Sequence, residues 1–409
     1  MTSPNPPKVG SPFKRDHSPP AGKGNEGVGR PSQLKQSVAL RTRRESIWEL
    51  ANPQLRELTV YEPGKPIEET ARELGVEPGA IVKLASNENP LGPSPKAIQA
   101  MHDALENAHL YPDGSGLYLR KAIATKLGVA PDNIILGNGS NEVIEFLGHA
   151  FLNPGDDVIT SQHAFIVYKL LATSFGARAI EVPAPDFQQD LDRMLDAITP
   201  KTRLIFVPNP NNPTGTLISQ RKIDSFMSRV PGNIIVVFDE AYFEFLNDPP
   251  DTLRYVRAGQ NVAVLRTFSK IHGLAGLRIG YGVAPVDLIE VLHKTRQPFN
   301  VNSIAHAGAL AALNDAAHQH ETKRVVDEGR AYLQDKLTEM KIQFVPGVAN
   351  FVMVNVGDGL AIFDQLLRRN IIVRPLKGYG LPEWVRISVG TIEENEKCVS
   401  ALRDVIRTQ

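Results

Sequence analysis

Residues 234–242 read Ile234-Ile235-Val236-Val237-Phe238-Asp239-Glu240-Ala241-Tyr242. The first five form a near-continuous apolar run, which is typical of a strand in a parallel sheet that helices cover on both faces. Similar short runs, separated by longer helical patterns, occur at 134–136, 158–160, 204–207 and 262–265. This alternation predicts an α/β fold with a doubly wound, mostly parallel sheet.

The pattern changes after about residue 300, where long helical stretches accompany separate strand-like runs at 351–356, 371–373 and 385–389. We therefore expect a large domain over residues 86–300 and a smaller α+β domain over residues 301–409. Residues 45–85 should form an N-terminal segment that joins the small domain. Near the end of the chain, Thr391 and Glu394 form a capping-box pattern, which predicts the start of a last helix.

The first 44 residues differ in composition from the rest of the chain. They are rich in Pro, Gly, Ser, Lys and Arg and contain almost no large apolar side chains, so we expect residues 1–44 to be a disordered basic tail. A transit peptide is an alternative, but prolines and glycines oppose the amphipathic helix that such a peptide forms. We assign the tail no function.

The overall composition is that of a globular protein, with 42% apolar and 22% charged residues among 409. Lys plus Arg and Asp plus Glu number 45 each, so no net charge attracts the chain to nucleic acid or to an anionic membrane. The single cysteine, Cys398, excludes an internal disulfide and fits a reducing compartment. We therefore expect a cytoplasmic protein that acts on small molecules, with no metal site and no nucleic-acid or membrane partner.

Four polar motifs follow predicted strands. In open parallel sheets the ligand lies at the carboxyl ends of the strands, so we expect these motifs to form one site. They are Gly137-Asn138-Gly139-Ser140-Asn141-Glu142, Asn209-Pro210-Asn211-Asn212-Pro213-Thr214-Gly215, Asp239-Glu240-Ala241-Tyr242, and Thr267-Phe268-Ser269-Lys270 with Gly273-Leu274-Ala275-Gly276-Leu277-Arg278.

Each motif has a functional and a plain interpretation. The first leads into a helical segment, where free amides reached through glycines can hold a phosphate, although such a stretch is more often a turn. The second can be a rigid loop. A carboxylate at Asp239, directly after a buried strand, should meet a cationic group, because an unpaired buried charge is costly. Lys270 is either a surface residue or a desolvated, activated amine.

These four motifs, in this order and at these spacings, resemble those of the fold-type-I pyridoxal-phosphate transferases of the class I/II aminotransferase kind. The resemblance runs from about residue 55 to the C-terminus, and within that superfamily it is strongest to the histidinol-phosphate aminotransferases. Three further stretches carry the likeness to that group: Lys83-Leu84-Ala85-Ser86-Asn87-Glu88-Asn89-Pro90-Leu91-Gly92, Tyr111-Pro112-Asp113-Gly114, and Val385-Arg386-Ile387-Ser388-Val389-Gly390-Thr391.

The resemblance implies pyridoxal 5′-phosphate as the cofactor and a role for each residue around its ring. Lys270 would form the Schiff base with the cofactor and move the proton during transamination. Asp239 would pair with the pyridine nitrogen and keep it protonated. Tyr242 and Asn212 would hydrogen-bond the 3′-oxygen, and Phe165 would stack on the ring face. These last three could alternatively be packing residues.

The resemblance also implies how the phosphate of the cofactor is bound. Ser269 and Arg278 would bind it together with the amides near Ser140 and Asn141. Tyr111 would reach the phosphate bound in the neighbouring subunit, so the active unit would be a homodimer.

The same resemblance implies a substrate site for histidinol phosphate and 2-oxoglutarate, which would be converted to imidazole-acetol phosphate and glutamate in histidine biosynthesis. Arg386 would bind the α-carboxylate by planar two-point hydrogen bonding; without the resemblance, a surface ion pair would be the better interpretation. Arg374 and Tyr61 would contact the far phosphate of the substrate, and Asn89 would also line its site.

Three other functions remain open at this stage. An aromatic amino-acid aminotransferase would share every cofactor residue and differ only around the side-chain pocket. A threonine-phosphate decarboxylase would use the same lysine and the same phosphate-binding arginines. A regulator that binds the cofactor without turnover would usually carry a DNA-binding module, and the proline-rich tail contains no helix-turn-helix pattern. His272, two residues beyond Lys270, departs from the family pattern, and we expect it to pack beside the pocket.

Overall fold

The computed structural model describes residues 47–56, 58 and 66–407. The tail expected over residues 1–44 and the substrate contact expected at Tyr61 lie outside these residues. Contacts divide the chain into two units, Met1–Ala51 and Asn52–Gln409. The first contributes one described helix, α1 (Ile47–Leu50), and the second contains the sheets and the other described helices.

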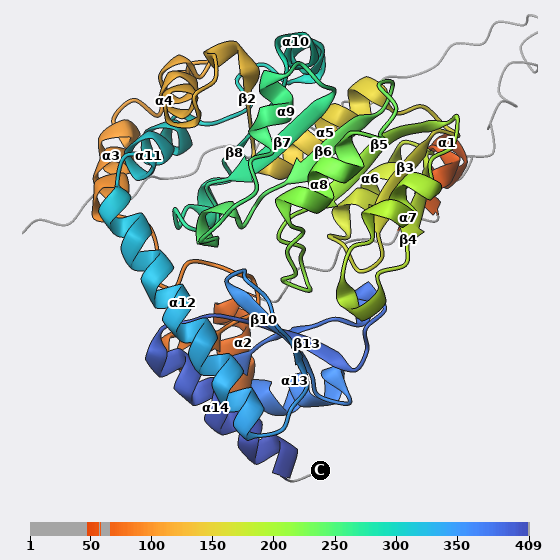
Figure 1. Ribbon diagram of the computed structural model, residues 1–409. Coiled ribbons are helices and arrows are strands. Elements are labelled where there is room, and N and C mark those ends of the chain that lie inside the picture. The colour runs from red at the N-terminus through yellow and green to blue at the C-terminus, as the bar shows by residue number, and fades with distance from the viewer. Residues whose placement is uncertain (1–46, 57, 59–65, 408–409) are drawn as a thin grey trace, which may run out of the picture. The chain divides into compact units, whose positions relative to one another are not determined.

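A seven-stranded sheet forms the centre of this unit, in the order β2-β8-β7-β6-β5-β3-β4 (Figure 1). Its strands are β2 (Ile134–Gly137), β3 (Asp157–Ser161), β4 (Arg178–Val182), β5 (Thr202–Pro208), β6 (Ile235–Asp239), β7 (Val262–Thr267) and β8 (Gly280–Val283). Neighbouring strands from β4 to β7 run parallel, and β8 runs antiparallel to both β7 and β2. The mostly parallel sheet expected from the sequence is therefore confirmed.

Alternate residues of β6 enter two different cores, because successive side chains of a strand point to opposite faces. Val236 and Phe238 belong to one apolar cluster, and Ile235 and Val237 belong to the other. The first cluster is covered by α3 (Pro95–Leu105), α4 (Leu117–Leu127), α7 (Leu191–Asp196), α8 (Gln220–Met227), α9 (Leu253–Arg257) and α11 (Ser303–Leu313). The second is covered by α5 (Ser140–Phe151), α6 (Val167–Ser174) and α10 (Val286–Thr295). Helices on both faces explain why the strand is apolar throughout.

A second group of elements comes mostly from the part of the chain after the large sheet, with α2 contributed from before it (Figure 1). A four-stranded antiparallel sheet has the order β12-β13-β10-β9. Its strands are β9 (Phe344–Val345), β10 (Phe351–Asn355), β12 (Arg374–Pro375) and β13 (Trp384–Ser388), and the helices with it are α2 (Ile67–Leu74), α12 (Ala316–Glu339), α13 (Gly359–Leu367) and α14 (Ile392–Arg407). The capping box at the start of α14 is confirmed, since the Glu394 amide donates to Thr391 Oγ1 and the Thr391 amide donates to Glu394 Oε2.

The segment before the large sheet connects to this second group. β1 (Val82–Lys83) pairs in parallel with β11 (Ile371–Ile372), and Val82 and Leu84 belong to the same apolar cluster as Val326 and Val354. The domain bounds stay a prediction, but the boundary at residue 300 would place α11 in the small domain. Instead, α11 packs against α3 and α4 beside the seven-stranded sheet.

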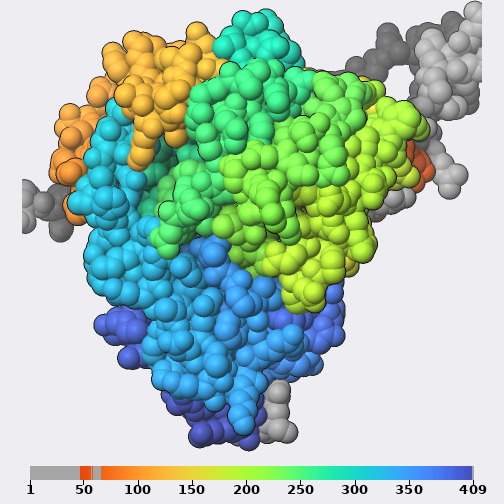
Figure 2. Space-filling view, viewed as in Figure 1, coloured from red at the N-terminus to blue at the C-terminus, as the bar shows by residue number. Residues whose placement is uncertain are grey.

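The two sheets meet where the loop after β5 approaches the segment before β10. The Val348 amide donates to Gly215 O over 2.9 Å. A Cβ atom on Gly215, which has φ of +75°, would lie 3.1 Å from Gly347 Cα, so both positions need glycine for this approach. Figure 2 shows on this face that blue atoms of the C-terminal part lie against green and yellow-green atoms of the part with the large sheet.

No helix among the described residues is long and apolar enough to cross a membrane.

Candidate active site

A cavity of about 270 Å³ lies at the carboxyl ends of β5, β6 and β7. All four motifs contribute to its wall, as expected from the sequence. The predicted cofactor residues that line it are Ser140, Asn141, Phe165, Asn212, Asp239, Tyr242, Ser269, Lys270 and Arg278. Ser86, Glu88 and Tyr168 line it as well.

Lys270 follows β7 by three residues and extends its amine into this cavity. Its Nζ donates to Ser86 O over 3.2 Å and lies 5.7 Å from the centroid of the Tyr242 ring. Desolvation in the pocket, reinforced by the positive charge of Arg386, lowers the pKa of Lys270 to about 8. A substantial fraction of this amine is therefore neutral, and nucleophilic, near physiological pH.

Asp239 ends β6, and the residue is 6% exposed. The Tyr168 hydroxyl donates to Asp239 Oδ2 over 2.7 Å, whereas Oδ1 has no hydrogen-bond partner among the described residues. Burial raises the pKa of Asp239, and the Tyr168 bond and the charge of Lys270 oppose that rise. The sequence predicts a cationic partner for Asp239, but no described side chain forms an ion pair with it. An unpaired carboxylate oxygen at the cavity wall fits a protonated ring nitrogen.

An anion-binding set lies at the N-terminus of α5. The helix begins at Ser140, and Gly139 precedes it with φ of +73°. A Cβ atom on Gly139 would lie 2.7 Å from Arg278 Nη2, so glycine leaves room for the guanidinium. Arg278 Nη1 donates to Ser269 Oγ over 3.4 Å. Helix amides, a hydroxyl and a guanidinium in one place fit a phosphate group. Together with Asp239, these residues fit the two polar ends of pyridoxal phosphate.

Tyr242 and Asn212 connect the cavity to the four-stranded sheet. The Tyr242 hydroxyl accepts a hydrogen bond from Asn87 Nδ2 over 2.9 Å, which leaves its own proton available to donate. Burial raises the pKa of Tyr242 to about 12, although Arg386 and Asn87 oppose it. Asn212 Oδ1 accepts a hydrogen bond from Arg386 Nη1 over 2.5 Å, and Arg386 Nη2 donates to Ala85 O over 2.7 Å.

The predicted substrate arginines are neighbours. Arg374 of β12 lies directly opposite Arg386 of β13 in the antiparallel register, and residues opposite each other in such a pair point to the same face. Arg386 is 6% exposed, and Arg374 is half-buried.

Four of the predicted residues that the structure describes are not among those that line the cavity: Arg374, Arg386, Asn89 and Tyr111. Asn89 donates to Ile271 O over 2.9 Å and to Thr322 Oγ1 over 3.2 Å, contacts that tie α12 to the lysine loop. Tyr111 is 84% exposed, and its ring stacks on Phe299 with 4.9 Å between centroids. The roles expected for Asn89 and Tyr111 stay predictions.

Sequence reasoning missed Tyr168, which lines the cavity and bonds to Asp239. Only its place three residues beyond Phe165, at the start of α6, could have associated it with the site. His272 packs against Phe268, with 4.8 Å between ring centroids, and faces a different cavity beside Arg266 and Tyr281.

The comparisons with known proteins agree with this geometry. The family described as aminotransferase class I and II matches residues 80–402. Histidinol-phosphate aminotransferase of Akkermansia muciniphila is 51% identical over 362 residues, which cover 88% of this chain and 100% of that protein. The same-named enzyme of Moorella thermoacetica is 47% identical over 350 residues, 85% of this chain and 90% of that protein.

A solved structure is similar over most of the chain. It is histidinol-phosphate aminotransferase from Sinorhizobium meliloti in complex with pyridoxal-5′-phosphate, with a TM-score of 0.80 and 28% sequence identity. The match covers 91% of this chain and all of that one. The chain therefore belongs to the class I and II aminotransferase family, and within it to the histidinol-phosphate aminotransferases.

Proposed function

We propose that this enzyme uses pyridoxal phosphate to transfer the amino group of histidinol phosphate to 2-oxoglutarate, a step of histidine biosynthesis. One observation carries the cofactor assignment: the unpartnered Asp239 Oδ1 and the anion-binding set at Ser140 line the same cavity as Lys270. The substrate assignment is supported by the names of relatives that are 44–51% identical. We place the reaction in the cytoplasm, which the single cysteine supports.

When bound, pyridoxal phosphate supplies an aldehyde and an electron-withdrawing ring. Lys270 Nζ would hold the cofactor at its aldehyde carbon, with the carbonyl oxygen released as water, and would later carry the proton to and from the substrate Cα. Asp239 Oδ1 would accept a hydrogen bond from the ring nitrogen and hold its proton there. Tyr242 and Asn212 would donate to the 3′-oxygen. Phe165, half-buried in the wall, would cover one face of the ring and exclude water.

The two opposed arginines would select the substrate. Arg386, which already donates into the cavity wall at Asn212, would bind the α-carboxylate that every amino acid presents. Arg374 lies on the same face of the sheet and would bind the phosphate at the far end of histidinol phosphate. An assay of the purified enzyme with histidinol phosphate and with phenylalanine, each with 2-oxoglutarate, tests this. A higher kcat/KM for phenylalanine would replace the proposal with an aromatic aminotransferase.

Replacing Arg374 should change specificity rather than general activity. We expect Arg374→Ala to lower kcat/KM for histidinol phosphate by roughly 10- to 100-fold, about 1.4–2.7 kcal/mol, because a charge-assisted phosphate contact is lost from a half-buried site. Activity with phenylalanine should change much less. Arg386→Ala should weaken both substrates together, and Arg369→Ala, an exposed arginine on the C-terminal side of α13, serves as the neutral control. An unchanged ratio of the two kcat/KM values in Arg374→Ala would contradict the assignment.

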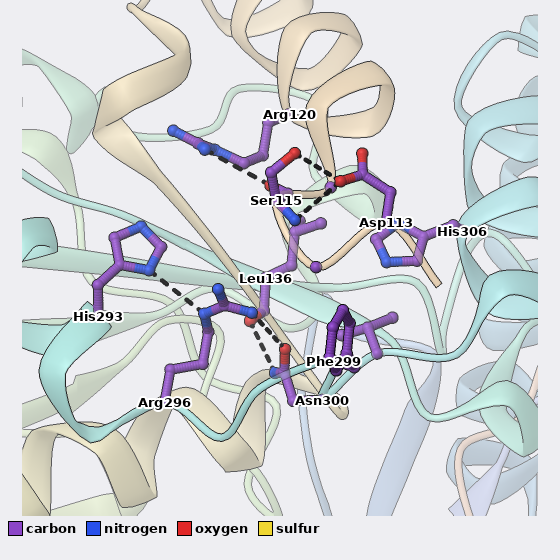
Figure 3. Close-up of a pocket in the computed structure, with 12 residues that line it drawn as sticks. Asp113, Ser115, Arg120, Leu136, His293, Arg296, Phe299, Asn300 and His306 are labelled. Carbon is purple, nitrogen blue, oxygen red and sulfur yellow. Dashed lines mark hydrogen bonds between the residues drawn. The ribbon is translucent and has the colours of Figure 1, made fainter. Parts of the chain in front are cut away.

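We further propose that the active unit is a homodimer. Phe299, which is exposed, stacks on Tyr111, and the nearby sequence contributes four more exposed large apolar side chains, Leu105, Leu110, Leu117 and Tyr118. Exposed apolar side chains that gather on one surface are typical of protein interfaces. Local hydrogen bonds hold the residues on either side of this contact: Asp113 accepts from the Ser115 amide and hydroxyl, and Arg296 donates to Asn300 next to Phe299 (Figure 3). An exposed tyrosine that Phe299 holds in place fits a role in the neighbouring site.

Mixed dimers test whether Tyr111 serves the other subunit. Lys270→Ala subunits and Tyr111→Phe subunits should each be impaired alone, and mixing them should restore up to about a quarter of the wild-type activity, because random pairing leaves one intact site in half of the dimers. The measurement is turnover after unfolding and refolding the mixture. Mixed dimers that form without activity above both parents would show that each site is built from one chain.

A further inference from the structure

Tyr168 stands between the cavity and the core of the seven-stranded sheet. It is the second residue of α6 and is fully buried. Its ring stacks on Phe206 of β5, with 4.4 Å between centroids and 9° between planes. Its hydroxyl donates to Asp239 Oδ2 over 2.7 Å. Because the ring is held on β5, the hydroxyl has one fixed place relative to the end of β6.

The hydrogen bond from Tyr168 makes the two carboxylate oxygens of Asp239 different. Oδ2 is occupied by Tyr168, and Oδ1 is unpartnered among the described residues and lies at the cavity wall. A carboxylate without the first contact could rotate about its Cβ–Cγ bond, since terminal torsions of this kind are broad. The hydrogen bond therefore selects the rotamer in which one oxygen faces the core and the other faces the ligand.

The same contact affects the charge of Asp239. Burial raises the pKa of this carboxyl group, which favours the neutral acid. The groups that face it are Tyr168, Lys270, Tyr242, Glu240 and the backbone amide of Ala241. Of these, Tyr168 gives the largest opposing effect. The pKa of Tyr168 is itself raised well above its ordinary value, so its hydroxyl keeps its proton and remains a donor.

We propose that Tyr168 is a positioning residue of this enzyme, which keeps Asp239 ionised and directs Oδ1 at the ring nitrogen of the cofactor. The inference rests on the function proposed above and adds a residue to its machinery. Tyr168 would act through Asp239 and not on the reacting atoms, because its hydroxyl is bonded to Asp239 Oδ2. Loss of the hydroxyl should let the proton move from the ring nitrogen towards Asp239, which weakens the ring as an electron acceptor.

Tyr168→Phe tests this with the ring and its stacking on Phe206 retained. In the holoenzyme loaded with ¹⁵N-labelled pyridoxal phosphate, the ring-nitrogen resonance should move towards the unprotonated form. We expect kcat to fall roughly 10- to 100-fold, the range for losing one hydrogen bond to a charged group, with little change in KM. An unmoved nitrogen resonance with unchanged kcat would overturn the inference.

Tyr255→Phe is the matched control. Tyr255 is also buried, and its hydroxyl donates to Asp224 over 2.5 Å on the outer side of the sheet, away from the cavity. Its loss should lower the melting temperature of the cofactor-free protein while the nitrogen resonance and kcat stay at wild-type values. A purely structural role for Tyr168 predicts that the two variants behave alike.

A double variant and a tyrosine analogue test the role of Tyr168 further. Adding Tyr168→Phe to Asp239→Asn should cause no additional loss of kcat, whereas additive losses would show that Tyr168 acts independently of Asp239. If Tyr168→Phe does not fold, a fluorinated tyrosine at position 168 keeps the shape and is a stronger donor to Asp239, so the nitrogen resonance should move the opposite way, towards the protonated form. An unmoved resonance, or a shift towards the unprotonated form, would contradict the role. Wild-type protein that binds no pyridoxal phosphate would overturn the proposed function instead.

Discussion

Lys270→Ala should abolish transamination almost completely, with kcat lowered by roughly a thousandfold or more. General acid–base catalysis alone contributes about 10²–10⁴-fold, and this variant loses the covalent attachment of the cofactor as well. The anion-binding set at Ser140 is untouched, so the variant should still bind pyridoxal phosphate. The measurement is single-turnover transamination of the loaded protein, followed by cofactor absorbance.

Covalent labelling locates the lysine directly. Borohydride treatment of the loaded wild-type enzyme should attach the cofactor irreversibly to Lys270, as peptide mapping would reveal. The control is Lys201→Ala, which changes an exposed lysine outside the cavity and should retain both labelling and turnover. Recovery of the label on another lysine, or normal turnover in Lys270→Ala, would remove this residue from the mechanism.

The lowered pKa of Lys270 gives this prediction a pH dependence. An amine attacks a carbonyl only in its neutral form, and the pKa of about 8 places the change of charge close to physiological pH. In the cofactor-free protein, covalent capture of pyridoxal phosphate should therefore accelerate as the pH rises through about 8 and level off above it. A rate that continued to rise up to the ordinary lysine range near pH 10.5 would show that the pocket leaves the amine unperturbed.

The large sheet and the cofactor cavity could be predicted from the sequence because both follow from local rules. The apolar run at 235–238 requires cover on both faces, and motifs that follow parallel strands must meet at one edge of the sheet. The order of the four motifs was enough to bring Lys270, Asp239 and Ser140 together. The cap at Thr391 is local in the same way, since both partners lie within one turn.

The rest depends on contacts between distant parts of the chain. Tyr168 has the pattern of an ordinary core residue, and only the hydrogen bond across 71 positions to Asp239 gives it a polar role. Asn89 belongs to a motif that lines the site, yet its amide bonds to Thr322, 233 positions away. α11 follows the expected boundary at residue 300 but packs on α3, because its small alanines fit that surface. Composition and periodicity contain no information about such pairings.

Asp239→Asn should separate folding from catalysis. The folded-state pKa of Asp239 is raised, so the buried carboxylate lowers stability at pH values above its ordinary pKa, where the unfolded chain is ionised without cost. Asparagine removes that cost and still accepts the Tyr168 hydrogen bond. The cofactor-free variant should therefore melt at the same temperature as wild type or higher at pH 7.

Catalysis should fall in the same variant, because a neutral amide cannot hold the proton on the ring nitrogen. We expect kcat to drop by roughly 10²–10³-fold, as for other losses of a buried electrostatic contact to the reacting system. Asp157→Asn is the matched control: Asp157 is equally buried but begins β3 at the opposite end of the sheet, where it pairs with Arg178. The hydrogen bond with Arg178 lowers the pKa of Asp157, so the ionised carboxylate stabilises the fold. Asp157→Asn should therefore lose stability and keep its turnover. Near-normal turnover in Asp239→Asn would mean that the ring nitrogen is held by another group, and the role proposed for Tyr168 would fail with it.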